Sequence, residues 1–130
     1  MIVDSSAIVA ILKGESEAAD FVALLLEDHG PRMSGANYVE AGVVADSGKD
    51  AVLSRQFDSL LQELQVSIEP VSAQQAIMAR QAYRDFGKGS GHPANLNFGD
   101  CFAYALASET GQPLLFKGDD FTQTNITAAA

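Results

Sequence analysis

Acidic residues follow two apolar runs that have the composition of buried strands. Asp4 ends the run Ile2–Val3 and leads at once into a helix-like stretch. Asp119 and its neighbour Asp120 come shortly after the run Leu114–Phe116. Ligands of open α/β sheets bind outside the carboxyl ends of the strands, so these acids stand where a functional site is expected. Taken singly, Asp4 would equally suit a helix N-cap, and the Asp119-Asp120 pair would suit a solvated turn.

Two further acids lie within apolar helical patterns. Glu40 has Val43 and Val44 one turn away, so its face of the predicted helix is apolar. Asp100 directly precedes CFAYALA, a stretch that is apolar on nearly every helical face. A buried carboxylate is costly unless it is paired, protonated or bound to a metal ion. The alternatives are an N-cap for Asp100 and an ion pair with a distant arginine for Glu40.

The four acidic positions together predict a site for a hard cation. No histidine is placed to join Asp4, Glu40, Asp100 and the Asp119-Asp120 pair, of which Asp119 is the candidate. Donor sets made only of oxygen select Mg²⁺ or its substitute Mn²⁺, which keep several waters and bridge the phosphates of a substrate. The corresponding chemistry is phosphodiester hydrolysis assisted by the metal ion. We therefore take these four residues as candidate catalytic and metal-binding residues.

Strand and helix patterns alternate along the chain that must position these acids. Short apolar or alternating runs predict strands at residues 2–3, 32–33, 66–71 and 114–116, with an edge strand at 125–127. Helical patterns lie between them, and residues 87–97 form the one long irregular segment. This alternation favours an α/β fold with a mainly parallel central sheet flanked by helices. With no repeat or linker, residues 1–130 are expected to form one domain.

Charge and cysteine content narrow the function classes. A net charge of −9 argues against broad binding to phosphate backbones, but leaves a basic partner or a nucleic acid held through metal ions. The single cysteine, Cys101, excludes an internal disulfide and fits a reducing compartment. The apolar start of the chain is too short to span a membrane, so a soluble cytoplasmic protein is expected. Arg80, Arg84 and Lys88, spaced by four, form a basic stripe that suits either an RNA backbone or a solvated helix face.

Four segments, in order along the whole chain, resemble the PIN domain. They are VDSSA at residues 3–7, ANYVEAG at 36–42, LNFGDCFAYALA at 96–107 and LLFKGDDF at 114–121. More closely, the chain looks like the toxin of a VapBC-type toxin–antitoxin pair. The resemblance places the first three family acids at Asp4, Glu40 and Asp100, and gives Ser6 the role of supporting the first acid. It implies a Mg²⁺-dependent endoribonuclease that acts on RNA, is inhibited by a VapB-type antitoxin and forms a homodimer.

The chain departs from the broad family pattern at the fourth acid. Many members read T-x-D-x-x-F after the last core strand, and counting back from Phe121 puts Gly118 where that acid belongs. Because glycine reaches backbone angles closed to other residues, we expect Gly118 to turn the chain so that Asp119 reaches the pocket and Asp120 faces outward. The departure also leaves an alternative function, a catalytically silent PIN-like module that acts by binding a partner.

Overall fold

Four short parallel strands form the centre of the structure, a computed structural model that describes all 130 residues. Their order across the sheet is β3-β2-β1-β4. The strands are β1 (Ile2–Val3), β2 (Arg32–Ser34), β3 (Ser67–Glu69) and β4 (Leu114–Leu115). Six helices connect them: α1 (Ser5–Leu12), α2 (Ala18–Glu27), α3 (Gly35–Ser47), α4 (Ala51–Glu63), α5 (Ala73–Phe86) and α6 (Phe98–Thr110). The α/β fold with a parallel sheet flanked by helices, predicted from the sequence, is confirmed.

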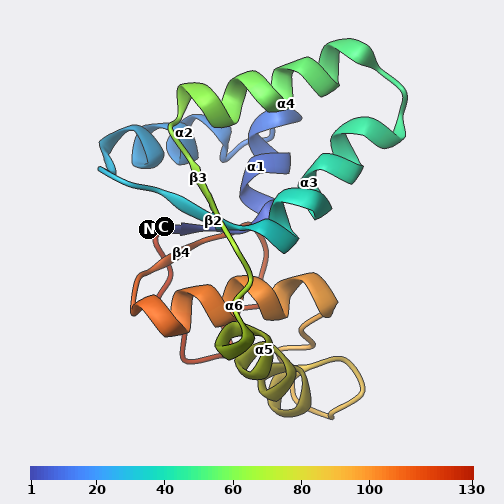
Figure 1. Ribbon diagram of the computed structural model, residues 1–130, viewed down its shortest axis with the longest axis vertical. Coiled ribbons are helices and arrows are strands. Elements are labelled where there is room, and N and C mark those ends of the chain that lie inside the picture. Colours follow the sequence, from blue (N-terminus) through green and yellow to red (C-terminus); the bar gives the residue numbers. More distant parts are fainter.

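The helices form two layers, one on each side of the sheet (Figure 1). Helices α1 to α4 pack on one side, and α5 and α6 pack on the other. Neighbouring strand residues point to opposite faces, so β1 and β4 each contribute to both cores. Ile2 and Leu114 belong to the core with α5 and α6, whereas Val3 and Leu115 belong to the core with α1 to α4. A strand of two residues is therefore buried on both faces, as expected for a parallel sheet covered by helices.

The register of the sheet fixes where the chain leaves each strand. Ile2 pairs with Leu114 and Val3 with Leu115, so β1 and β4 end side by side. The backbone N–H of Asp4 then donates to the carbonyl of Leu115 at 2.9 Å. β2 also runs parallel to β1, and it leads directly into α3. The segments that follow three strands therefore emerge at one edge of the sheet.

Two local predictions are wrong. The face of α3 that holds Val43 and Val44 is exposed by 60% and 38%, and the helix instead buries Asn37, Ala41 and Ala45. Small residues on that side let α3 approach α1 closely, which the larger valines could not do. The expected edge strand at 125–127 is reduced to a single bridge between Leu114 and Ala128.

No helix in the structure has both the length and the apolar character needed to cross a membrane.

Candidate active site

Asp4 is held between β1 and α1 with one of its carboxylate oxygens unused. It caps α1, because its Oδ2 accepts hydrogen bonds from the Ser6 backbone N–H at 3.1 Å and from Ser6 Oγ at 2.5 Å. Its Oδ1 is buried and has no hydrogen-bond partner. Burial raises the pKa of Asp4 to about 6, and the nearby charge of Glu40 adds to this effect, while the bonds from Ser6 oppose it. The N-cap and functional interpretations of Asp4 are therefore compatible.

Ser6 links the first acid to the segment after β4. Its Oγ donates to Asp4 and also accepts the backbone N–H of Lys117 at 3.0 Å. The Lys117 side chain in turn forms ion pairs with Glu15 and Glu17 before α2. The supporting role that the family resemblance gave to Ser6 matches these contacts.

Glu40 projects from α3 towards the start of α6. Its Oε1 accepts hydrogen bonds from Ser5 Oγ and from Asn37 Nδ2, the latter at 3.2 Å. Its carboxylate also lies directly over Gly99. No arginine pairs with Glu40, so the ion-pair alternative does not hold. Ser5 and Asn37 were not identified from the sequence, although Asn37 lies one helical turn before Glu40.

Asp100 stands in the first turn of α6 and is only 7% exposed. It is not the N-cap: Asn97 is, and Asp100 completes a capping box by accepting the Asn97 backbone N–H at 3.0 Å. Burial raises the pKa of Asp100 to about 7, with further contributions from the charges of Asp4 and Asp120 and from a hydrogen bond with Asp120. Asp100 therefore lies within reach of two other carboxylates.

The structure brings Asp120, and not Asp119, to the other acids. Gly118 has a φ of 103°, so the expected sharp turn is present. The backbone carbonyl of Asp119 accepts bonds from Thr122, and of the two neighbouring exposed acids only Asp120 contributes to the raised pKa of Asp100. Phe121 is 2% exposed and packs against the Phe116 ring, which fixes the residue before it. The assignment of the fourth position to Asp119 thus lacks geometric support, and we define the acidic cluster as Asp4, Glu40, Asp100 and Asp120.

The acidic cluster fits a hard cation. No three acidic, histidine or cysteine side chains enclose an ion by themselves. Mg²⁺, however, is commonly held through one or two carboxylates and keeps its other ligands as water. A bound cation would satisfy the unpartnered Oδ1 of Asp4. It would also offset the burial, and the neighbouring negative charges, that raise the pKa values of Asp4 and Asp100. Asp4 and Asp100 are the acids best placed to hold it, with Glu40 and Asp120 beside them.

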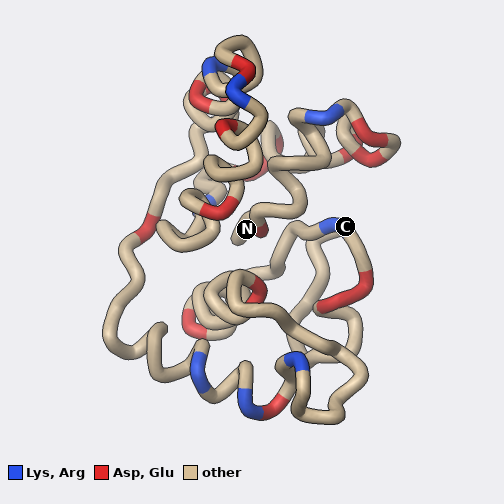
Figure 2. Tube along the Cα trace, turned by 90° about the vertical axis from the view of Figure 1, so that its right-hand side faces the viewer, with Lys and Arg blue, Asp and Glu red and all other residues tan.

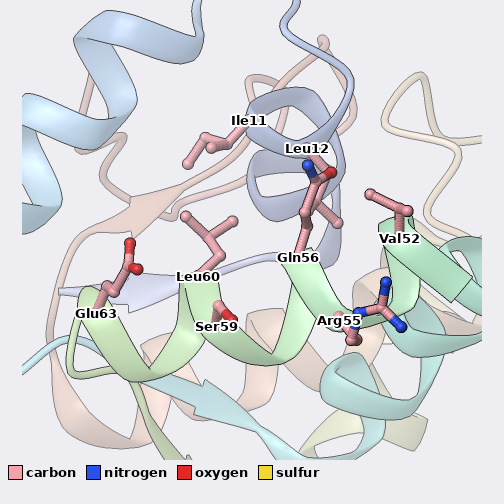
Figure 3. Close-up of a pocket in the computed structure, with 8 residues that line it drawn as sticks. All are labelled: Ile11, Leu12, Val52, Arg55, Gln56, Ser59, Leu60 and Glu63. Atoms are coloured by element: carbon pink, nitrogen blue, oxygen red, sulfur yellow. The ribbon is translucent and has the colours of Figure 1, made fainter.

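Two hollows differ in their relation to the acidic cluster. One, of about 530 Å³, is lined mainly by polar residues of the 93–95 loop and the 119–123 turn, and Asp120 stands in its wall. The other, of about 460 Å³, lies between α1 and α4 (Figure 3). Ile11 and Leu60 face each other across it, and Arg55 and Glu63 stand towards its opposite ends. Of the two, only the first opens beside the acids, so it is the candidate entrance for a substrate.

The basic stripe of Arg80, Arg84 and Lys88 is exposed on α5 and the loop after it. Figure 2 shows Lys and Arg gathered along this helix, apart from most of the acidic residues. Arg84 makes only a long contact of 3.9 Å with its exposed neighbour Asp85, so its charge remains available to solvent. The geometry is compatible with both the RNA-binding and the solvated-face interpretations.

Comparison with known proteins shows which family the chain resembles in both sequence and fold. Residues 1–126 match the PIN domain family. Over 129 residues, 99% of this chain and 97% of the relative, the chain is 52% identical to ribonuclease VapC28 of Mycobacterium tuberculosis.

Two solved structures share the fold at low identity. The crystal structure of Mycobacterium tuberculosis VapC20, a sarcin-ricin loop cleaving toxin, matches with a TM-score of 0.74 at 15% identity, over 97% of this chain and 95% of that one. A toxin–antitoxin complex from Klebsiella pneumoniae matches with a TM-score of 0.69 at 18% identity, over 92% of this chain and 88% of that one.

The raised pKa of Asp4 predicts that the metal-free protein loses stability as the pH rises. The carboxyl has a pKa of about 6 in the folded protein against an ordinary value of 3.8, so between these values the unfolded chain binds fewer protons than the folded one. The free energy of unfolding should fall from about pH 4 to about pH 7, by ~3 kcal/mol for this group. Urea titrations of the parent and of Asp4→Asn at pH 5 and pH 8 isolate the contribution of Asp4. The variant should lack this part of the loss of stability. Added Mg²⁺ should raise the free energy of unfolding of the parent at pH 8, and much less at pH 5. If, without metal, the stability of the parent relative to the variant rises from pH 5 to pH 8, the assignment is contradicted.

The position of Asp120 predicts which of the two neighbouring acids affects metal binding. Asp120→Asn should weaken Mn²⁺ affinity by ~10–100-fold, the range for residues that support metal ligands. Asp119→Asn is the matched control, because it removes the same charge one residue away. Calorimetric titration of Mn²⁺ into both variants measures the difference. A larger loss for Asp119→Asn would return the fourth position to the residue expected from the sequence.

Proposed function

The chain belongs to the PIN-domain family, among its VapC-type members, and from this premise we propose that it is a Mg²⁺-dependent endoribonuclease, the toxin of a toxin–antitoxin pair that acts in the cytoplasm. The observation that carries the proposal is the acidic cluster, in which Asp4 keeps a buried oxygen without a partner. Identity of 52% to a protein named as a ribonuclease supports the same activity.

Each residue of the acidic cluster has a separate role in holding the metal ion and the substrate. A bound Mg²⁺ supplies an activated water and neutralises charge that develops on the phosphate. Ser6 holds Oδ2 of Asp4, so that Oδ1 remains without a hydrogen-bond partner and is free to hold the ion. Asn97 orients Asp100 in the same way. Asp120 is exposed beside Asp119 in the wall of the hollow, and is the member of the acidic cluster most open to solvent.

RNA is the proposed substrate, and the basic stripe is the proposed contact with its backbone. Arg80, Arg84 and Lys88 lie outside the cluster, so they can bind phosphates without neutralising the acids. The silent-module alternative depended on the absence of a fourth acid at residue 118. The influence of Asp120 on Asp100 supports a fourth acid supplied two residues later, and so argues against the alternative.

The proposed partner is a VapB-type antitoxin that presents a basic segment to the acidic cluster. The chain carries a net charge of −9, and its buried carboxylates lack basic partners. The planar guanidinium of an arginine can donate two hydrogen bonds to carboxylates at once, and so can substitute for a cation there. Such an antitoxin would compete with the metal ion for the same acids.

The nuclease proposal predicts that the metal and the two central acids are essential for cleavage. Asp4→Asn and Asp100→Asn should each abolish RNA cleavage in Mg²⁺ while the fold, checked by circular dichroism, is retained. EDTA should abolish cleavage by the parent, and the cognate antitoxin should suppress it in Mg²⁺. Cleavage that continues unchanged in EDTA would refute the metal-dependent mechanism.

The exposed apolar residues of α3 and β3 predict the face of a homodimer. Val39 and Val43 are 59% and 60% exposed, and Ile68 on the edge strand β3 is 47% exposed. We propose that a second copy covers them. Light scattering should then give twice the chain mass for the parent and a single chain for Val43→Glu, whereas Leu26→Glu, at a 64% exposed position on α2, should stay dimeric. A monomeric parent would exclude this assembly.

A further inference from the structure

A buried side-chain amide joins the two helices that carry Glu40 and Asp100. Asn37 is 0% exposed on α3. Its Nδ2 donates both to Glu40 Oε1, at 3.2 Å, and to the backbone carbonyl of Gly99, at 2.9 Å. Gly99 immediately precedes Asp100 in α6. One amide group therefore connects the carboxylate of one acid to the backbone that carries the other.

Gly99 provides the space that Glu40 occupies. A Cβ atom added at residue 99 would collide with Glu40 Oε2 and lie 2.5 Å from the carboxyl carbon of Glu40. Any other residue would displace the carboxylate. The absence of a side chain at 99 is thus a steric requirement of the Glu40 position, and does not reflect an unusual backbone angle, since this glycine lies within a regular helix.

The amide of Asn37 is not explained by stability alone. Its Oδ1 is buried and has no hydrogen-bond partner. A buried polar atom without a partner is destabilising, and an apolar side chain of similar size would avoid that penalty. Departures from the most stable choice are expected at functional sites. The remaining role of Asn37 is to donate its two hydrogen bonds, one to the Glu40 carboxylate and one to the backbone next to Asp100.

On the basis of the nuclease function proposed above, we propose that Asn37 and Gly99 form a positioning clamp for Glu40. The clamp holds the Glu40 carboxylate against the first turn of α6 and so sets its position relative to Asp100. Ser5 completes the arrangement from the other side by donating to the same oxygen, Oε1. Neither clamp residue touches the substrate; both act through Glu40.

Two variants remove the clamp in different ways. Asn37→Leu deletes both donated bonds and the unpartnered oxygen, and Gly99→Ala fills the space under the carboxylate. Each should lower kcat for RNA cleavage by ~10–100-fold with KM nearly unchanged, and weaken Mn²⁺ binding in calorimetry. Asn37→Leu should be at least as stable as the parent to urea in the metal-free state. Asn37→Ala also removes both donors without adding a charge, should lose cleavage equally, and serves if the leucine variant does not fold.

Gln75 offers a matched control for losing a buried amide. It is 6% exposed, and its Nε2 donates to Glu109 Oε1 at 3.0 Å, away from the acidic cluster. Gln75→Leu should leave kcat and Mn²⁺ affinity unchanged. The Glu40→Gln background adds a second control, because Asn37→Leu should weaken Mn²⁺ binding much less there if it acts through Glu40.

The outcomes separate the clamp from the nuclease proposal. If the parent cleaves RNA and the Asn37 and Gly99 variants match Gln75→Leu in kcat and Mn²⁺ affinity, the clamp is refuted. Full additivity with Glu40→Gln would likewise overturn it. If the parent cleaves no RNA, the nuclease proposal fails, and the Mn²⁺ titrations still decide whether the clamp positions Glu40.

Discussion

The structure depends on carboxylates that are buried close to one another at the end of a parallel sheet. Because β1 pairs in parallel with β2 and β4, the chain leaves those strands at one edge, where Asp4 follows β1, and Asp100 joins it from the start of α6. The fold tolerates the repulsion by giving two of the acids a second role. Oδ2 of Asp4 caps α1, and Asp100 closes a capping box at the start of α6. Hydrogen bonds at the start of its own helix thus stabilise part of the negative charge of each acid, and a cation would balance the rest.

This division explains which sequence predictions succeeded. Asp4 and Asp100 were located correctly because strand ends and helix starts leave local signals in the sequence. Capping and function looked like alternatives at the sequence level, but capping uses only Oδ2 of Asp4 and leaves Oδ1 without a partner, so the two interpretations are compatible. For Glu40 the expected location agrees with the structure, but the reasoning from apolar neighbours does not, because Val43 and Val44 are exposed. The contacts of Glu40 come instead from Ser5, Asn37 and Gly99, which are distant from one another in the chain.

The fourth acid shows why spacing alone could not settle a side-chain direction. The positive φ of Gly118 was foreseeable, and the resulting turn is present. Which of the next two carboxylates points inward depends on Phe121, whose burial against Phe116 fixes the turn from its far side. That aromatic contact is between residues on the strand exit and the turn, and no periodic pattern encodes it. Both side chains are exposed, but a one-residue difference separates Asp120, which contributes to the raised pKa of Asp100, from Asp119, which does not.

The charge distribution constrains how such a protein would approach RNA. With a net charge of −9, the molecule as a whole repels a polyanion, so binding cannot rely on the broad attraction that cationic proteins use. The available attraction would be restricted to the basic stripe on α5 and to a cation that the acidic cluster would hold. A substrate would have to satisfy both at once, which favours an RNA of defined shape over an arbitrary strand. The same acidity that weakens general RNA binding also strengthens the attraction of a basic antitoxin segment, so selectivity for the substrate and susceptibility to the inhibitor follow from one property of the sequence.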